Sequence, residues 1–120
     1  MNYDKLEKII NESFEIKEKV SPKSDKKLIK AINETINLVD GGKIRVANKI
    51  NGNWIVNQWI KKAILLSFRI NKMEMMKGPY TTWYDKVPGK TVKWKEKDWK
   101  KASYRHVPNG VVRKGAYIAK

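Results

Sequence analysis

The stretch NQWIKKAILLSFRI, residues 57–70, is apolar on nearly every side. Its apolar side chains form two stripes at helical spacing, Trp59–Ala63–Leu66–Ile70 and Ile60–Ile64–Phe68. A helix that is apolar all round is typical of the centre of a bundle, because each of its faces has a neighbour to contact. Residues 57–70 therefore predict the central helix of a helical domain.

Only a few basic residues interrupt the apolar surface of this predicted helix. Lys62 and Arg69 are seven residues apart, which places them on one side of the helix, with Lys61 adjacent. Two interpretations stay open: these charges form a solvated stripe on a mostly buried helix, or they form a cationic edge that faces an anionic ligand. Lys62 and Arg69 are therefore candidate anion-facing residues.

Two amphipathic helices are predicted before the central one. The first spans residues 2–19 and ends at Ser21-Pro22, since proline cannot continue a helix. The second starts at a cap formed by Ser24 or Asp25 and ends at Gly41-Gly42. Their apolar stripes have helical spacing: Tyr3, Leu6, Ile10 and Phe14 in the first helix, and Leu28, Ile32, Ile36 and Val39 in the second.

A hairpin is predicted between the second helix and the central one. The apolar side chains alternate in KIRVANKI, residues 43–50, and Asn51-Gly52 follows, the preferred pair for a two-residue type I′ turn. The return strand is NWIV, residues 53–56, which pairs Lys49 with Trp54. Because an isolated hairpin is marginally stable, we expect it to dock on the helices.

The rest of the chain gives weaker signals. Residues 71–93 are expected to be irregular, since Gly78-Pro79 and Pro88-Gly89 are typical of loops. The segment KWKEKDWKK, residues 93–101, predicts one or two helical turns. In the closing VVRKGAYIAK, residues 111–120, Val112 and Ile118 are six residues apart, the period of a parallel β-helix.

Composition limits the class of protein. A chain of 120 residues with 41% hydrophobic residues predicts one packed domain rather than disorder. With no cysteine and one histidine, we expect no disulfide, no metal site and no covalently bound cofactor. No apolar run approaches the roughly 20 residues of a membrane span, and residues 1–20 do not form a secretory signal. The expectation is a cytoplasmic protein without a membrane partner.

The net charge of +15 raises the question of nucleic-acid binding. The chain has 23 Lys but only 4 Arg, with 10 Asn and 13 Ile, a mixture that AT-rich codons produce without selection for a polyanion. The lysines are also spread over every segment. Only residues 93–101, with Trp94 and Trp99 among the charges, have the pattern of a patch that stacks on bases. The sequence does not favour nucleic acid as a partner.

Three motifs, in their order and spacing, closely resemble the tetrahydrodipicolinate N-succinyltransferase family: GNWIVNQWIKKAILLSFRI (52–70), WYDKVPGK (83–90) and YRHVPNGVVRKGAYIAK (104–120). The resemblance covers nearly the whole chain and corresponds to the N-terminal third or so of that family. It implies an α+β fold in which residues 1–105 form an N-terminal helical, acceptor-side domain with a short β-hairpin. Residues 106–120 would then be the start of a left-handed parallel β-helix, cut off within its first coil.

The resemblance also implies a reaction and its participants. The family transfers succinyl from succinyl-CoA, its co-substrate, to the amine of ring-opened tetrahydrodipicolinate in lysine and diaminopimelate biosynthesis, and it works as a homotrimer. Arg105 matches a substrate-binding position and is the expected clamp for an acceptor carboxylate. The alternative is an arginine that satisfies the junction between the two parts of the fold. His106 is expected to be incidental, and Asp85 to stabilise a turn.

The resemblance implies no catalytic residue within this sequence. The acid–base carboxylates and the coils that bind pantetheine are expected beyond residue 120, so the 120-residue chain alone is expected to be inactive. Two other function classes stay open: a helical module that binds an acidic small molecule or partner without catalysis, and a small basic nucleic-acid binder.

Overall fold

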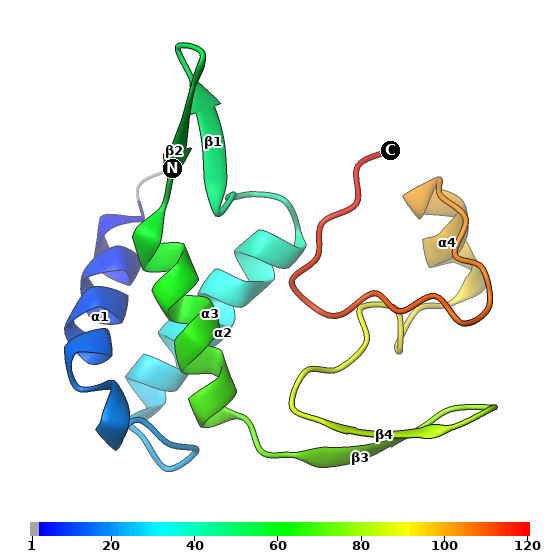
Figure 1. The fold of residues 1–120 in the computed structure, drawn as a ribbon, viewed down its shortest axis with the longest axis horizontal. Helices are drawn as coiled ribbons and strands as arrows, with labels where there is room; N and C mark the ends of the chain where they lie inside the picture. Colours follow the sequence, from blue (N-terminus) through cyan, green and yellow to red (C-terminus); the bar gives the residue numbers. More distant parts are fainter. Residues whose placement is uncertain (1–2) are drawn as a thin grey trace.

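The structure is a computed structural model that describes residues 3–120, and its first half is a bundle of three helices (Figure 1). The helices are α1 (Asp4–Glu15), α2 (Lys26–Asp40) and α3 (Gln58–Ile70), with a 3-10 turn, η1 (Lys17–Lys19), after α1. Helix α3 contacts both α1 and α2, and α1 also contacts α2, so the three helices form one bundle. The prediction that residues 57–70 form the central helix is confirmed.

The hydrophobic core of the described chain lies entirely in this bundle. Each helix contributes a side chain that is almost completely buried, Ile10 from α1, Ile32 from α2 and Leu66 from α3. Every described residue that is less than about a tenth exposed falls between residues 10 and 70. Within the bundle, the buried Thr35 hydroxyl donates a hydrogen bond to the carbonyl oxygen of Ala31 at 2.9 Å, so it is not left unpaired.

The helix ends show which of the predicted caps operate. The Asp25 carboxylate accepts a hydrogen bond from the Lys27 N–H at 2.5 Å, so Asp25 caps α2. The Ser24 hydroxyl instead accepts from the Ser21 N–H at 2.9 Å and closes the preceding turn. Helix α2 ends at Gly41-Gly42 as predicted, with Gly42 in the left-handed region at φ +68°. Helix α1 is shorter than predicted, because the chain tightens into η1 after Glu15.

The predicted hairpin is formed by β1 (Ala47–Ile50) and β2 (Asn53–Val56). Lys49 lies opposite Trp54, and the turn residues Asn51 and Gly52 both have positive φ, which confirms the register and the turn. The expected docking on the helices is wrong. The strands project from the bundle (Figure 1), Trp54 remains 69% exposed, and only the base is held, by the Asn57 N–H bonded to the Val46 carbonyl at 2.7 Å.

The second half of the chain has regular structure but no buried core. It contains an antiparallel hairpin, β3 (Glu74–Lys77) with β4 (Thr82–Asp85), and the helix α4 (Glu96–Ala102). The expectation that residues 71–93 are irregular is therefore wrong for these two strands. Their apolar and aromatic residues favour strands, but four-residue strands are too short to show a period. The short helix expected within residues 93–101 is confirmed by α4.

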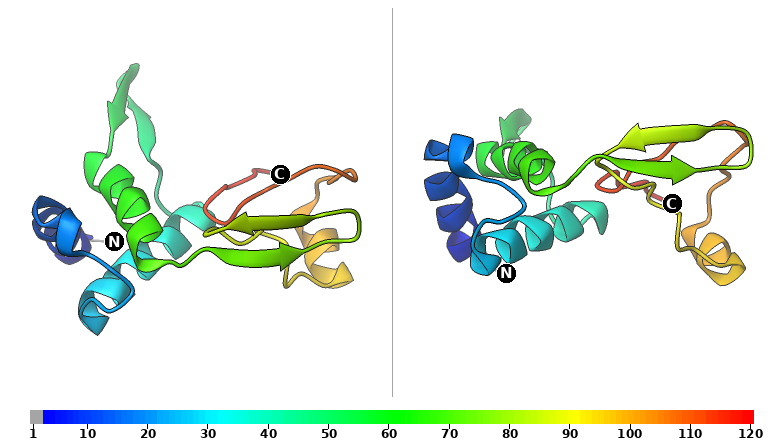
Figure 2. Two further views of the ribbon diagram at one scale, coloured as in Figure 1. Left: turned by 60° about the horizontal axis from the view of Figure 1, so that its bottom comes forward. Right: turned by 90° about the horizontal axis from the view of Figure 1, so that it is seen from below.

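The two halves lie side by side, as Figure 2 shows from two directions. The radius of gyration is 16.0 Å, above the about 14 Å typical of a compact domain of this length. The closing segment returns from α4 to the end of α2 and joins the halves (Figure 1). In residues 3–120 no helix is long and apolar enough to cross a membrane.

The structure does not show a β-helical coil in residues 106–120. Instead, the chain around Arg113 runs antiparallel to residues 88–90: the Lys90 N–H donates to the Val112 carbonyl at 2.8 Å and the Lys114 N–H to the Pro88 carbonyl at 2.9 Å. A β-helical coil needs three faces and a neighbouring coil to bury its interior. A single six-residue face has neither, and Val112 and Ile118 are left partly exposed.

Candidate functional site

Arg105 lies on an extended segment that follows α4. Ser103 adopts the left-handed conformation at the end of α4, at φ +64°, and turns the chain away from the helix. From there, burial alternates along the chain: Tyr104 and His106 are half-buried, whereas Arg105 between them is exposed. This is the two-residue alternation of extended backbone, and it directs Arg105 outward because its neighbours point inward.

The inward side is an aromatic cluster made of Trp94, Trp99, Tyr104 and His106. The ring centroids of Trp94 and Trp99 are 4.9 Å apart in an edge-to-face arrangement, and Tyr104 lies 6.1 Å and 6.0 Å from them. The His106 ring lies 5.7 Å from Trp99. The second half of the chain has no buried core, and the contacts within this aromatic cluster hold it together instead. The same contacts fix the segment that carries Arg105.

The aromatic cluster changes the interpretation of residues 93–101. Trp94 and Trp99 face each other and Tyr104, and both are half-buried. Their rings are thus engaged inside the protein rather than presented for stacking on bases. The Trp-Lys pattern that raised nucleic-acid binding is explained by local packing.

Arg105 itself is free to bind. Its guanidinium makes no hydrogen bond or ion pair within the described residues. A guanidinium carries five N–H donors in a planar fork that matches a carboxylate. Its neighbour is different: the His106 Nε2 atom is buried with no hydrogen-bond partner in the described chain. The Nε2 atom of His106 is therefore not placed to exchange a proton with a ligand bound outside.

Lys62 and Arg69 lie elsewhere, at the seam between α3 and the segment that contains α1 and η1. The Lys62 ammonium donates to the Asn11 side-chain oxygen at 3.0 Å, and Arg69 pairs with the Glu18 carboxylate at 2.9 Å. Helices α1 and α4 lie at opposite sides of the molecule in Figure 1, so these cations are not gathered with Arg105. Their anion-facing role stays a prediction.

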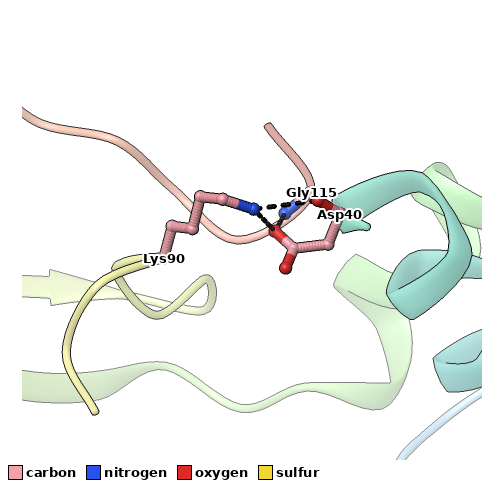
Figure 3. A network of polar contacts seen from close by, with 3 residues as sticks. All are labelled: Asp40, Lys90 and Gly115. Atoms are coloured by element: carbon pink, nitrogen blue, oxygen red, sulfur yellow. Dashed lines mark hydrogen bonds and ion pairs between the residues drawn. The ribbon is translucent and has the colours of Figure 1, made fainter. Parts of the chain in front are cut away.

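The segment that carries Arg105 is tied to the bundle by a network at the end of α2 (Figure 3). Lys90 Nζ lies 2.7 Å from Asp40 Oδ1 and 2.9 Å from the Asp40 carbonyl oxygen, and the Gly115 N–H donates to Asp40 Oδ1 at 2.8 Å. A lysine at this position satisfies a terminal helix carbonyl and suits the negative end of the helix dipole. The Asp40–Lys90–Gly115 network therefore fixes three distant segments against each other.

A second set of contacts comes from the motif at residues 83–90. Arg113 Nη2 lies 2.7 Å from Asp85 Oδ2, and the Lys86 ammonium donates to the Phe68 carbonyl oxygen at 2.8 Å at the end of α3. The pKa of Asp85 is lowered from its ordinary value, chiefly by the Lys86 backbone N–H and also by Arg113. Asp85 is the last residue of β4 and the chain bends directly after it, so its expected role in a turn stays a prediction.

Tyr117 adds a third contact between the closing segment and the bundle. The Arg45 guanidinium lies 4.1 Å from the centre of the Tyr117 ring, a cation–π contact. The same ring lies directly over Gly42, where a Cβ atom would come within 2.6 Å of it. Two features therefore favour glycine at position 42: its positive φ and the close approach of the Tyr117 ring.

The sequence alone does not predict these contacts between distant segments. The Asp40 contacts span 50 and 75 residues, and the Asp85–Arg113 pair spans 28, so no local spacing reveals them. Together they hold Arg105, which is exposed and unpaired within residues 3–120, on a fixed segment. This arrangement can bind a carboxylate, but neither the buried Nε2 atom of His106 nor the Asp85 carboxylate, which is paired with Arg113, is placed to act as a base.

The family model and the curated relatives that match this chain carry the name of one enzyme. A family model described as "Tetrahydrodipicolinate N-succinyltransferase N-terminal" matches residues 5–70. The 2,3,4,5-tetrahydropyridine-2,6-dicarboxylate N-succinyltransferase of Pelagibacter ubique is 51% identical over 118 residues, which are 96% of this chain and 43% of that protein. The protein of the same name from Agrobacterium fabrum is 48% identical, over 96% of this chain and 42% of its own length.

The similarity extends to the end of the chain. The corresponding protein of Cereibacter sphaeroides is 45% identical over 100% of this chain and 44% of its own length. The chain therefore spans less than half the length of the curated relatives that it matches.

Proposed function

Because the chain belongs to the tetrahydrodipicolinate N-succinyltransferase family, we propose that it forms the acceptor-binding part of an acyltransferase. The proposed reaction transfers succinyl from succinyl-CoA to the amine of ring-opened tetrahydrodipicolinate, in lysine and diaminopimelate biosynthesis. The neutral amine nitrogen attacks the thioester carbon and the carbon–sulfur bond breaks. A base takes the amine proton and passes it to the departing sulfur, so CoA leaves as the thiol.

The observation that carries the proposal is the exposed Arg105, unpaired within residues 3–120 on a segment fixed at both flanks. The acceptor has two carboxylates, and a guanidinium binds a carboxylate through two parallel hydrogen bonds. The aromatic cluster on one side and the Asp40–Lys90–Gly115 network on the other limit the movement of this segment. Such preorganisation lowers the cost of ordering the clamp on binding.

The remaining parts of the proposal concern groups that these residues do not supply. The base and the donors that stabilise the thioester oxyanion are assigned to the β-helical part of the family, into which residues 106–120 lead. The domain boundary then falls near residue 105, and the assembly is a homotrimer in the cytoplasm. The 120-residue chain alone is expected to bind the acceptor without releasing CoA.

The test joins residues 1–120 to the remaining part of the Pelagibacter ubique relative and follows CoA release from succinyl-CoA in the presence of the acceptor. We expect turnover by this chimera and none by the 120-residue chain. Arg105→Gln is expected to raise KM for the acceptor roughly ten- to one-hundred-fold, the effect of losing a hydrogen-bonded charge pair. KM for succinyl-CoA should not change.

Two controls make the test decisive. Lys97→Gln removes an exposed charge from α4 and should leave both KM values unchanged. Arg105→Lys keeps the charge but not the planar fork and should recover only part of the loss. A folded chimera, verified by circular dichroism, that releases no CoA would refute the assigned activity. An equal rise of both KM values in Arg105→Gln would refute the acceptor clamp.

A further inference from the structure

A cavity of about 310 Å³ lies where the closing segment crosses the bundle. Its walls come from α2, from α3, from the loop after β4 and from the residues around Arg113. Small-molecule sites are typically concave, begin at about this volume and occur where two parts of a fold meet. The cavity is separate from Arg105, which does not line it.

Half of the residues that line the cavity are apolar, and we call them the apolar wall. Ile36 and Val39 of α2, Ile64 and Phe68 of α3, and Val87 and Pro88 of the loop contribute to it. These side chains would contact an aliphatic body of several carbons and remove it from water. An ion without such a body would leave this wall unused.

The charged residues that line the cavity are all basic. Arg113 and Lys114 line it together with Asn33 and Asn71, and no acidic residue is among the residues that line the cavity. The Lys114 ammonium and the two Asn side-chain amides make no hydrogen bond within the described chain. Three side chains with N–H donors that are free within residues 3–120 therefore line one cavity. The nearby carboxylates of Asp85 and Asp40 are bonded to Arg113 and to the Gly115 N–H.

Arg113 is held in place at this site. Its Nη2 atom is bonded to Asp85 Oδ2 at 2.7 Å, and its backbone lies in the antiparallel contact with residues 88–90. One hydrogen bond to Asp85 leaves the other guanidinium donors available. The Asp40–Lys90–Gly115 network next to it fixes the backbone on the other side (Figure 3).

From this combination we infer that the cavity is a binding site for a small aliphatic carboxylate, with its head at Lys114, Arg113 and the two amides and its body against the apolar wall. The inference is independent of succinyl transfer, because it concerns binding by residues other than Arg105. Both features of the ligand are required: the charge selects an anion, and the wall selects a hydrocarbon body over a bare ion.

The experiment titrates the ¹⁵N-labelled 120-residue chain with three probes and follows its amide resonances. Hexanoate carries both features, acetate carries only the head, and hexylamine carries the same body with the opposite charge. We expect saturable shifts with hexanoate at the Asn33 and Asn71 side-chain amides and at the Gly115 N–H. Acetate and hexylamine should bind at least roughly ten-fold more weakly.

Variants locate the site. Lys114→Gln should weaken hexanoate binding roughly ten-fold, the effect of losing one charged hydrogen bond. Lys93→Gln, which removes an exposed lysine that does not line the cavity, should leave it unchanged. Arg105→Gln should also have no effect, which separates this site from the proposed acceptor clamp. Equal binding of hexanoate and hexylamine, unsaturable shifts spread over the lysine-rich surface, or unchanged binding by Lys114→Gln would each overturn the inference.

Discussion

Lys90 and Asp40 form a closely bonded pair across 50 residues of sequence, with Lys90 Nζ bonded to both a carboxylate oxygen and the carbonyl oxygen of Asp40. The Lys90 side chain is only 10% exposed, so water competes weakly for these bonds. The same carboxylate oxygen accepts the Gly115 N–H. The pair therefore controls how firmly the closing segment is held on the bundle.

Replacing Lys90 by Met should loosen the closing segment without unfolding the bundle. A hydrogen bond to a charged group contributes about 1.5–3 kcal/mol, so the Gly115 N–H should exchange with solvent roughly ten-fold faster or more. Hydrogen exchange followed by NMR measures this rate. Lys93→Met, at an exposed lysine nearby in sequence, is the control and should not change it. Acceleration of α3 amides by the same factor would show that the pair instead supports the whole fold.

The stability of the bundle should depend on Leu66 far more than on its neighbour Leu65. Leu66 is 0% exposed at the centre of the core, whereas Leu65 on the same helix is 46% exposed. Leu66→Ala should lower the free energy of unfolding by about 2–5 kcal/mol, since it removes contacts and leaves a cavity. Leu65→Ala should cost about 1 kcal/mol or less. Urea unfolding followed by circular dichroism compares the two, and similar losses would contradict the described core.

The bundle could be predicted because its signals are local. Residues 57–70 carry apolar side chains all round, and the Asn51-Gly52 pair specifies its turn by backbone conformation alone. The hairpin register follows from that turn, and the cap at Asp25 follows from its side-chain oxygen. Each of these features depends on residues within a few positions of each other.

The candidate site was only partly predictable. The motif resemblance indicates Arg105, but its outward direction depends on Tyr104 and His106 turning inward to two tryptophans. The contacts of Lys90 and Arg113 join segments far apart in sequence and leave no local pattern. The weakness of isolated hairpins predicts that β1–β2 docks on the helices, but no sequence signal specifies what a strand face will contact.

The Asp85 carboxyl should titrate below its ordinary pKa of 3.8. A lowered folded-state pKa means that the charged form stabilises the fold above pH 3.8, and that this contribution is lost as the pH falls through the folded value. In Arg113→Gln the pKa should rise but stay below 3.8, because the Lys86 backbone N–H is the larger cause. An NMR titration of the carboxyl carbon measures both values.

Arg45→Gln is the control for that titration, since Arg45 contacts Tyr117 rather than Asp85. It removes one positive charge from the protein and should leave the Asp85 pKa unchanged. A pKa of 3.8 or higher in Arg113→Gln would show that the ion pair, rather than the backbone, sets the titration.

Binding to single-stranded nucleic acid should be electrostatic only, because Trp94 and Trp99 are engaged with each other. Stacking of a base on an aromatic side chain contributes about 1–3 kcal/mol, so a stacking tryptophan would lose roughly five-fold or more in affinity when replaced. Trp99→Leu should therefore change the affinity for an oligothymidylate by less than about two-fold. Fluorescence anisotropy of a labelled oligonucleotide measures this, at about 50 mM and 200 mM salt. The affinity of the unsubstituted chain and of Trp99→Leu for the oligonucleotide should fall steeply with salt, as expected for a net charge of +15. A five-fold loss in Trp99→Leu that persists at the higher salt would show that the tryptophan contacts a base.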